Sequence, residues 1–211
     1  YRETVGSSAQ GDHTFERPGT TGKGQFGHCK LKVSPAPRGE GLSVSHEALS
    51  RAGVPQAFID AMRASVESMY ASGCVAGYPM VDVQVELLEA RLHETDSSEA
   101  GYQVATAAAY REACNAASPQ LLEPFMKLEV ILPEEEDMGN IIGDINSRRG
   151  DISGISYRGK SQVVGALVPL EQMMGYATKM RTMTHGRGRY TMTFERYSPV
   201  SPEVAKMLMG Y

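Results

Sequence analysis

Between residues 81 and 87 the sequence alternates strictly between apolar and polar side chains. The apolar set is Val81, Val83, Val85 and Leu87, and the polar set between them is Asp82, Gln84 and Glu86. A period of two residues is that of a β-strand, because successive side chains of a strand point to opposite faces of its sheet. We therefore predict a sheet in this half of the chain with one face in a hydrophobic core and the other face in water.

Two helices are predicted around this strand. The first begins at Pro55, since proline is favoured in a first helical turn, and ends at Gly73. Apolar residues recur along it at spacings of three and four, which gives one buried stripe: Phe58, Met62, Val66 and Met69. The second helix begins at a capping box, with Asp96 as the cap and Glu99 as its partner, and ends near Ala117. Its alanine-rich sequence predicts close packing against a sheet.

The first 41 residues are rich in Gly, Ser, Thr and Pro. Within them Phe26–Val33 is predicted to be a strand, because apolar and polar residues alternate from Cys29 onward. The preceding segment, Arg17–Gly24, contains one proline and three glycines, so it is predicted to be a flexible, mildly basic hairpin tip.

The second half begins after two proline-containing pairs, Ser118-Pro119 and Glu123-Pro124. A chain of 211 residues suits two domains of about 100 residues each, so we predict domains at residues 1–123 and 124–211. The order predicted for the second is strand 126–132, helix 138–149, hairpin 152–168, helix 172–184 and strand 190–197. This βαββαβ order is that of a ferredoxin-like domain, and a short surface helix is predicted at Pro202–Met209.

The charge pattern leaves two interpretations open. The net charge of −4 does not by itself predict a nucleic-acid binder, but basic residues gather at Arg148-Arg149, at Arg158 and Lys160, and from Lys179 through Arg189. They either complement the C-terminal ends of helices or contact an RNA backbone. The acidic residues at 134–137 are predicted to form a solvated turn before a helix. The scattered cysteines, Cys29, Cys74 and Cys114, predict buried thiols rather than a disulfide or a zinc site.

Residues 154–161 match the phosphate-binding loop pattern GxxxxGKS letter for letter. That loop functions between a buried strand and the N-terminus of a helix, whereas a strand-like run, Gln162–Val168, follows here. We interpret Arg158-Gly159-Lys160 as a hairpin turn. A nucleotide hydrolase built on residues 154–161 is the alternative, and binding of labelled ATP or GTP would test it. No catalytic residue and no metal site are predicted in this chain.

Segments in both halves of the chain resemble bacterial elongation factor G, in order and nearly from end to end. Those similar to its fourth domain are residues 1–4 (YRET), 22–28 (GKGQFGH), 76–83 (AGYPMVDV) and 93–99 (HETDSSE). Those similar to its fifth domain are residues 121–127 (LLEPFMK), 142–150 (IGDINSRRG) and 175–188.

The resemblance implies an α+β chain: a ribosomal-protein S-five-like α/β sandwich with a left-handed crossover, followed by a ferredoxin-like βαββαβ domain. It implies a module of a translational GTPase that promotes ribosomal translocation of tRNA and mRNA by inserting its tip into the small-subunit decoding site. The partners expected are ribosomal RNA of both subunits, tRNA and mRNA, with no membrane. GTP and Mg would bind in a domain upstream of Tyr1, and no cofactor is expected in this chain. The protein is expected to be cytoplasmic and monomeric.

The resemblance also implies the site residues. One tip loop is Gly19, Thr20, Thr21, Gly22 and Lys23, and His93 stands on the neighbouring loop. The family usually has glycine where Thr21 stands, so this tip is expected to be bulkier and stiffer. The resemblance implies contacts with large-subunit RNA for Arg148, Arg149, Arg187 and Arg189. The alternatives are a paralogous module used in ribosome recycling or another specialised step, and a generic single-stranded RNA binder. The second alternative is weakened by the absence of Trp and by only 5 Phe residues.

Overall fold

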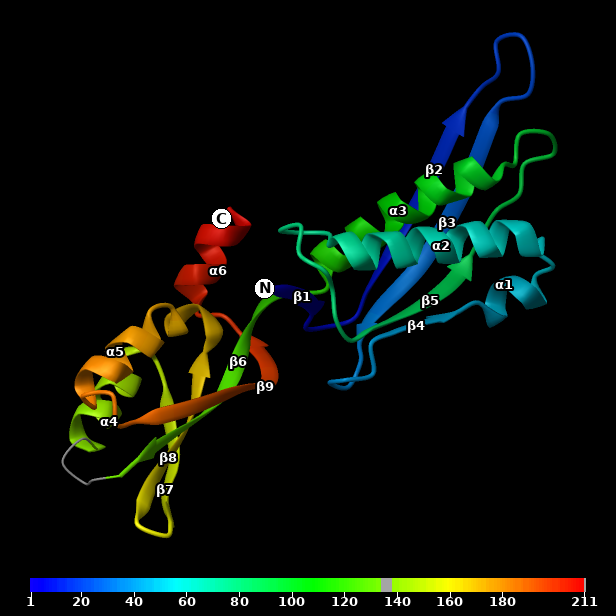
Figure 1. Ribbon diagram of the computed structural model, residues 1–211. Coiled ribbons are helices and arrows are strands. Elements are labelled where there is room, and N and C mark those ends of the chain that lie inside the picture. Colours follow the sequence, from blue (N-terminus) through cyan, green and yellow to red (C-terminus); the bar gives the residue numbers. More distant parts are fainter. Residues whose placement is uncertain (134–137, 211) are drawn as a thin grey trace. The chain divides into compact units, whose positions relative to one another are not determined.

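The computed structural model describes residues 1–133 and 138–210, so the predicted acidic turn at 134–137 lies outside the described residues. Helices and strands alternate irregularly along the chain, which confirms the predicted α+β class. The chain forms two compact units (Figure 1). Unit 1 comprises Tyr1–Leu122 and the residues from Val200 onward, and unit 2 comprises Glu123–Pro199. The predicted division after residue 123 placed the C-terminal segment with the second domain, whereas its contacts group it with unit 1.

Unit 1 contains a sheet of four strands in the order β2-β3-β5-β4. The strands are β2 (Ala9–Arg17), β3 (Gln25–Pro35), β5 (Val83–Glu89) and β4 (Leu42–Ser45). β4 runs parallel to β5, and the other neighbouring pairs are antiparallel. The strands predicted at 26–33 and 81–87 correspond to β3 and β5, whereas β2 and β4 were not predicted, because their short or polar sequences carry no clear alternation.

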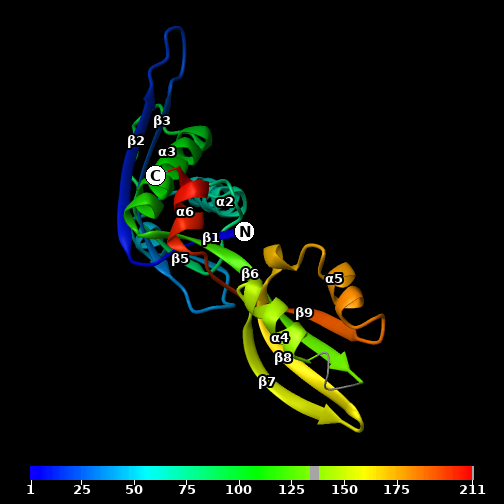
Figure 2. The ribbon, with the colours of Figure 1, turned by 90° about the vertical axis from the view of Figure 1, so that its left-hand side faces the viewer.

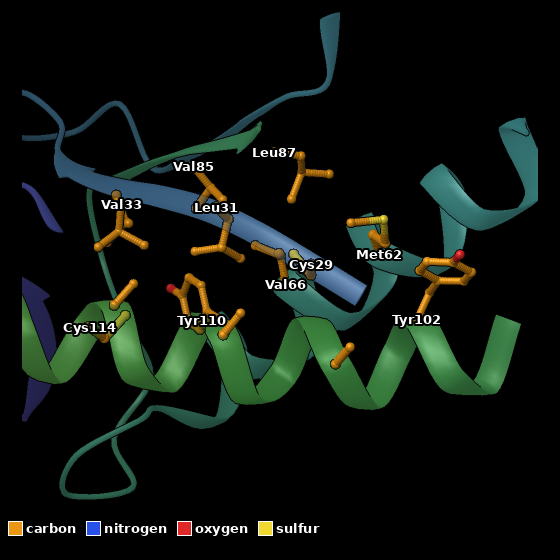
Figure 3. Packing of buried hydrophobic residues seen from close by; sticks show 14 of the residues in the cluster. Cys29, Leu31, Val33, Met62, Val66, Val85, Leu87, Tyr102, Tyr110 and Cys114 are labelled. Atoms are coloured by element: carbon orange, nitrogen blue, oxygen red, sulfur yellow. The ribbon is translucent and has the colours of Figure 1, made fainter. Parts of the chain in front are cut away.

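Helices α2 (Gln56–Ser72) and α3 (Glu99–Ala116) cover one face of this sheet, and the short helix α1 (Glu47–Arg51) precedes α2 (Figures 1 and 2). Figure 3 shows the core between them, where side chains of α2 and α3 meet those of β3 and β5. The predicted stripe of α2 is confirmed: Met62 and Val66 are buried, and Phe58 and Met69 pack against the same cluster. Outside the sheet, β1 (Arg2–Val5) pairs with the start of β6 (Pro119–Leu132). No helix in the described ranges is long and apolar enough to cross a bilayer.

The predicted capping box of α3 is wrong. Ser98 is the N-cap, and its side chain accepts a hydrogen bond from the Gly101 backbone N–H. The Asp96 carboxylate instead accepts a hydrogen bond from the backbone N–H of Gly24, far away in the sequence. Both residues are common caps, and the tertiary contact with Gly24 engages Asp96 outside the helix.

Helix α3 lies unusually close to strands β2 and β3, as its alanine content predicted. A Cβ atom added to Gly11 would lie 1.9 Å from the Ala109 carbonyl oxygen, and one added to Gly27 would lie 2.1 Å from the Gly101 carbonyl carbon. These distances are far below van der Waals contact, so only glycine permits the two backbones to approach in this way. The helix is thereby fixed in place along the length of the hairpin.

The N-terminal strand is anchored by the buried carboxylate of Glu3. Its two oxygens accept four backbone N–H hydrogen bonds of 2.7 to 3.0 Å from one loop; the donors are Cys74, Val75, Ala76 and Tyr78. Charge-assisted hydrogen bonds of this kind are about twice as strong as neutral ones. Glu3 therefore holds the loop between α2 and β5 in place and connects two of the segments that resemble the family.

Glu3→Gln is expected to destabilise unit 1 by about 2 kcal/mol, because hydrogen bonds to a charged group contribute about 1.5–3 kcal/mol each. The glutamine oxygen can still accept hydrogen bonds, but its NH₂ group would face backbone donors. The measurement is urea denaturation followed by circular dichroism. Glu67→Gln, on the exposed surface of α2, is the matched control. Equal denaturation midpoints for the two variants would contradict this role of Glu3.

Unit 2 has the order β6, α4 (Met138–Ser147), β7 (Asp151–Arg158), β8 (Ser161–Pro169), α5 (Tyr176–Met183) and β9 (Arg189–Pro199). This confirms the predicted βαββαβ order. β6 lies between β8 and β9, and β7 lies outside β8, which is the strand arrangement of a ferredoxin-like sheet. Both helices contribute to its core, which includes Ile141, Ile145, Tyr176 and Met180. The predicted C-terminal helix is present as α6 (Pro202–Met209).

The helix predicted at 172–184 is interrupted. A short 3-10 helix, Leu170–Met173, ends before Gly175, whose φ of 73° lies in the left-handed region, and α5 begins only at Tyr176. The hairpin at 152–168 is confirmed: Arg158 pairs with Ser161, and Gly159 turns the chain with a φ of 62°. Because β8 rather than a helix follows the GxxxxGKS match, residues 154–161 lack the helix N-terminus that binds phosphate.

Cys29 and Cys114 are buried, as predicted, and Cys74 is half-buried. Burial raises the pKa of the Cys29 thiol to about 12, so this thiol is not reactive near neutral pH. Interaction with the Cys114 side chain, together with burial, raises the pKa of Cys74. The wide spacing of the cysteines in the sequence did not predict this contact.

Candidate nucleic-acid interface

The hairpin formed by β2 and β3 carries the first predicted tip loop. The two strands remain paired up to Arg17 and Gln25, so residues 18–24 form the connecting loop. The predicted residues Gly19, Thr20, Thr21, Gly22 and Lys23 are all exposed. The hairpin therefore presents two hydroxyl groups, one ammonium group and backbone at its end. A Cβ atom added to Gly19 would lie 1.9 Å from the Gly22 carbonyl oxygen, so the turn itself requires a glycine there.

A second loop, residues 90–98 between β5 and α3, extends at the same end of unit 1 (Figure 1). It is attached to the hairpin by backbone and side chain. The Ser98 N–H donates to the Phe26 carbonyl oxygen at 3.1 Å, and Ser97 forms an isolated parallel bridge with Phe26. The Gly24 N–H donates to Asp96 Oδ1 at 3.1 Å. The structure therefore brings together the two loops that the resemblance assigned to the tip.

His93 is half-buried in this second loop, and several contacts orient its ring. Nδ1 accepts hydrogen bonds from the backbone N–H groups of Asp96 at 3.0 Å and Thr95 at 3.2 Å. Its ring lies 5.3 Å from the Phe26 ring, centroid to centroid. The His93 backbone N–H donates to Ser97 Oγ, and this hydroxyl also contacts the buried Tyr102 hydroxyl. The loop thus rests on the hairpin and on the first turn of α3.

The exposed groups of the two tip loops determine which ligands the tip can bind. The tip residues offer hydrogen-bond donors and one ammonium cation, and acidic residues such as Glu16 and Glu94 lie exposed beside them. Such a surface is not a strongly basic groove. It suits recognition of RNA by shape and by hydrogen bonds to phosphate and 2′-hydroxyl oxygens.

The structure gives Arg148 a role within unit 2. Its guanidinium pairs with Asp144 at 2.9 Å and donates to the carbonyl oxygens of Gln172 at 2.6 Å and Met174 at 3.2 Å. It also lies over the Tyr176 ring, 5.0 Å from the centroid. These contacts engage Nε and one terminal nitrogen of the guanidinium, and they support the segment before α5.

The other three arginines, Arg149, Arg187 and Arg189, are all exposed. Arg149 donates through both terminal nitrogens to the buried carboxylate of Glu123, at 3.2 and 3.1 Å. Arg187 lies on the turn between α5 and β9 and donates to the Thr184 carbonyl oxygen at 3.4 Å, and Arg189 is the first residue of β9. All three therefore lie on the surface of unit 2, and Arg149 is held there by the Glu123 carboxylate.

Comparison with known protein families decides the identity of both halves. The family model "Elongation factor G, domain IV" matches residues 1–118, and the family model "Elongation factor G C-terminus" matches residues 120–208. The chain belongs to the elongation factor G family. Together the two matches show that the chain comprises domain IV and the C-terminal domain of an elongation factor G, a protein of translation.

The fold comparison agrees with this assignment. A crystal structure of a protein from Thermus thermophilus superposes with a TM-score of 0.85 at 29% sequence identity. The superposition covers 99% of this chain and 31% of that chain. The present chain therefore spans about a third of the length of that similar protein.

Two residues of the tip were missed as site residues by sequence reasoning. Asp96 was interpreted as a helix cap, although it bonds the hairpin. Phe26 was assigned only to a strand, although its ring packs on His93. Both lie inside segments that resemble the family, so that resemblance was the signal available for them.

Proposed function

We propose that this chain is the C-terminal module of a translational GTPase and that it promotes ribosomal translocation of tRNA and mRNA. The tip formed by the hairpin loop and the His93 loop enters the small-subunit decoding site. The observation that carries this proposal is the joining of the two loops at one end of a long hairpin supported by α3. Exposed donors on a rigid support suit contact with an RNA duplex of fixed shape.

The chain acts in this proposal by binding and not by covalent chemistry. Translocation is accelerated if the tip binds the ribosomal state along the path of movement more tightly than the starting state. Rigid support matters, because a flexible tip would lose binding free energy on becoming ordered. The close contact of α3 with β2 and β3 supplies that rigidity.

The remaining parts of the proposal concern unit 2 and the rest of the protein. Arg187, on the turn after α5, and Arg189, at the start of β9, contact large-subunit RNA through its phosphates. GTP and Mg bind in a domain upstream of Tyr1, and hydrolysis there is coupled to movement of the tip. The ribosome with its tRNA and mRNA is the partner, and the protein acts as a cytoplasmic monomer.

The proposal is tested by single-round mRNA translocation on pre-translocation ribosomes. The full-length protein is compared with the same protein truncated before Tyr1, and GTP hydrolysis is measured in parallel. We expect truncation to abolish fast translocation while hydrolysis continues. A full-length protein that translocates no faster than its truncated form would refute the proposal. Ribosome splitting by the full-length protein would then support the recycling alternative.

A further inference from the structure

The two tip loops are joined through one carboxylate. Asp96 Oδ1 accepts a hydrogen bond from the N–H of Gly24, the last residue of the hairpin loop, and Gly24 is buried although the residues before it are exposed. A Cβ atom added to Gly24 would lie 2.8 Å from Asp96 Oδ2 and 2.6 Å from the Arg17 carbonyl oxygen. Glycine at this position therefore permits the close approach of the carboxylate.

The backbone of the same aspartate orients the His93 ring. The Asp96 N–H and the Thr95 N–H both donate to His93 Nδ1. Because two donors converge on Nδ1, this nitrogen is the acceptor of the ring, and the proton of the neutral imidazole lies on Nε2. His93 thus offers an Nε2–H donor, and its partner is an acceptor atom such as a phosphate or 2′-hydroxyl oxygen.

We infer that Asp96 is a positioning residue that fixes the hairpin loop and the Nε2–H of His93 in one arrangement for binding to RNA. The side chain of Asp96 holds the hairpin, and its backbone holds the imidazole, so a shift of one loop moves the other. The Thr95 hydroxyl lies 3.3 Å from Asp96 Oδ1 and supports the same carboxylate. This inference rests on the proposed function, since the RNA bound is that of the decoding site.

A purely local role for Asp96 explains less. A loop residue that only closed its own turn would bond within residues 90–98, whereas its carboxylate reaches a residue 72 positions away in the sequence. The Gly24–Asp96 hydrogen bond uses a side chain, so a substitution at position 96 can remove it, whereas the Ser98–Phe26 hydrogen bond joins two backbones. A variant at position 96 therefore separates the attachment of the hairpin from the fold of the helix.

The test uses the full-length protein with three substitutions. Asp96→Ala removes the acceptor, Asp96→Asn keeps an acceptor oxygen at the same position, and Glu94→Ala removes an exposed neighbouring carboxylate as the control. Hydrogen–deuterium exchange of peptides covering residues 18–26 reports the attachment of the hairpin without a ribosome. We expect faster exchange for Asp96→Ala, and near wild-type exchange for Asp96→Asn and Glu94→Ala.

Translocation is measured on the same variants. We expect Asp96→Ala to be about tenfold slower, which corresponds to the loss of roughly one hydrogen bond's contribution to positioning, and Asp96→Asn to recover most of the rate. Unchanged exchange in Asp96→Ala would overturn the joining of the loops. If His93→Ala translocates slowly, then an Asp96→Ala variant with faster hydrogen–deuterium exchange but a wild-type translocation rate would overturn the positioning role. If His93→Ala also translocates normally, His93 does not contact the moving RNA and the positioning role of Asp96 fails, whereas failure of the proposed function itself is shown by the truncation before Tyr1.

Discussion

Gly27→Ala is expected to destabilise unit 1 by about 3 kcal/mol or more, the upper range for overpacking of a well-packed interior. The new methyl group would lie 2.1 and 2.2 Å from the carbonyl carbon and oxygen of Gly101. Those atoms belong to the backbone of α3, so no side-chain rotation relieves the clash. The helix has to move away from β3, which opens the core beside Tyr102.

Gly22→Ala is the matched control for this substitution. No heavy atom lies within 4 Å of the Cβ atom that it would add, and the residue sits in the same hairpin. Urea denaturation followed by circular dichroism should show a lowered midpoint for Gly27→Ala and an unchanged midpoint for Gly22→Ala. If the two midpoints coincide, the close contact between α3 and β3 does not limit stability. Because the contact lies beside the Ser98–Phe26 bond, Gly27→Ala should also loosen the tip.

Much of this fold could be predicted from hydrophobic periodicity. Strand β5 and helix α2 have one buried face each, and their patterns gave both elements within a few residues. Strand β2 has no such pattern, because Gly11 stands where an apolar side chain would point toward α3. The close packing of α3 requires glycine at this position instead of an apolar side chain, and a glycine in a sequence is more typical of a turn or a loop than of a strand.

The interrupted helix in unit 2 shows a second reason why hydrophobic periodicity does not predict every element. The segment from Gln172 to Thr184 has helical spacing, but Gly175 adopts a left-handed conformation and separates two short helices. Arg148, the residue that follows α4, donates to the carbonyl oxygens of Gln172 and Met174, so a side chain distant in sequence satisfies acceptors that a continuous helix would use. Local periodicity carries no information on such a partner.

The residues of the tip were predicted from the resemblance, but the hydrogen bonds that join its two loops were not. The residues at 19–23 and His93 lie on two loops at one end of unit 1, which the structure brings together. That Asp96 joins the loops could not be predicted, because a capping box and a tertiary hydrogen bond require the same residue types. The Glu3 anchor is a similar case, since one carboxylate in β1 serves a loop more than 70 positions later.

His93→Ala in the full-length protein is expected to slow translocation about a hundredfold, while GTP hydrolysis continues at its normal rate. The substitution removes the Nε2–H donor, the ring that packs on Phe26, and the acceptor for two backbone N–H groups of its own loop. Losing one contact with RNA and loosening the loop together raise the activation free energy of translocation by about 2–3 kcal/mol, which corresponds to that change in rate.

His93→Gln separates these two effects. The glutamine amide places an N–H donor near the position of Nε2, but it offers no aromatic ring to Phe26 and no acceptor at the position of Nδ1. We expect a rate between those of the wild type and His93→Ala, because the contact with RNA is kept while the loop is less ordered. If glutamine is as slow as alanine, the order of the loop dominates and the donor is secondary. If both variants translocate at the wild-type rate, His93 does not contact the moving RNA, and the hairpin loop alone has to account for the activity of the tip.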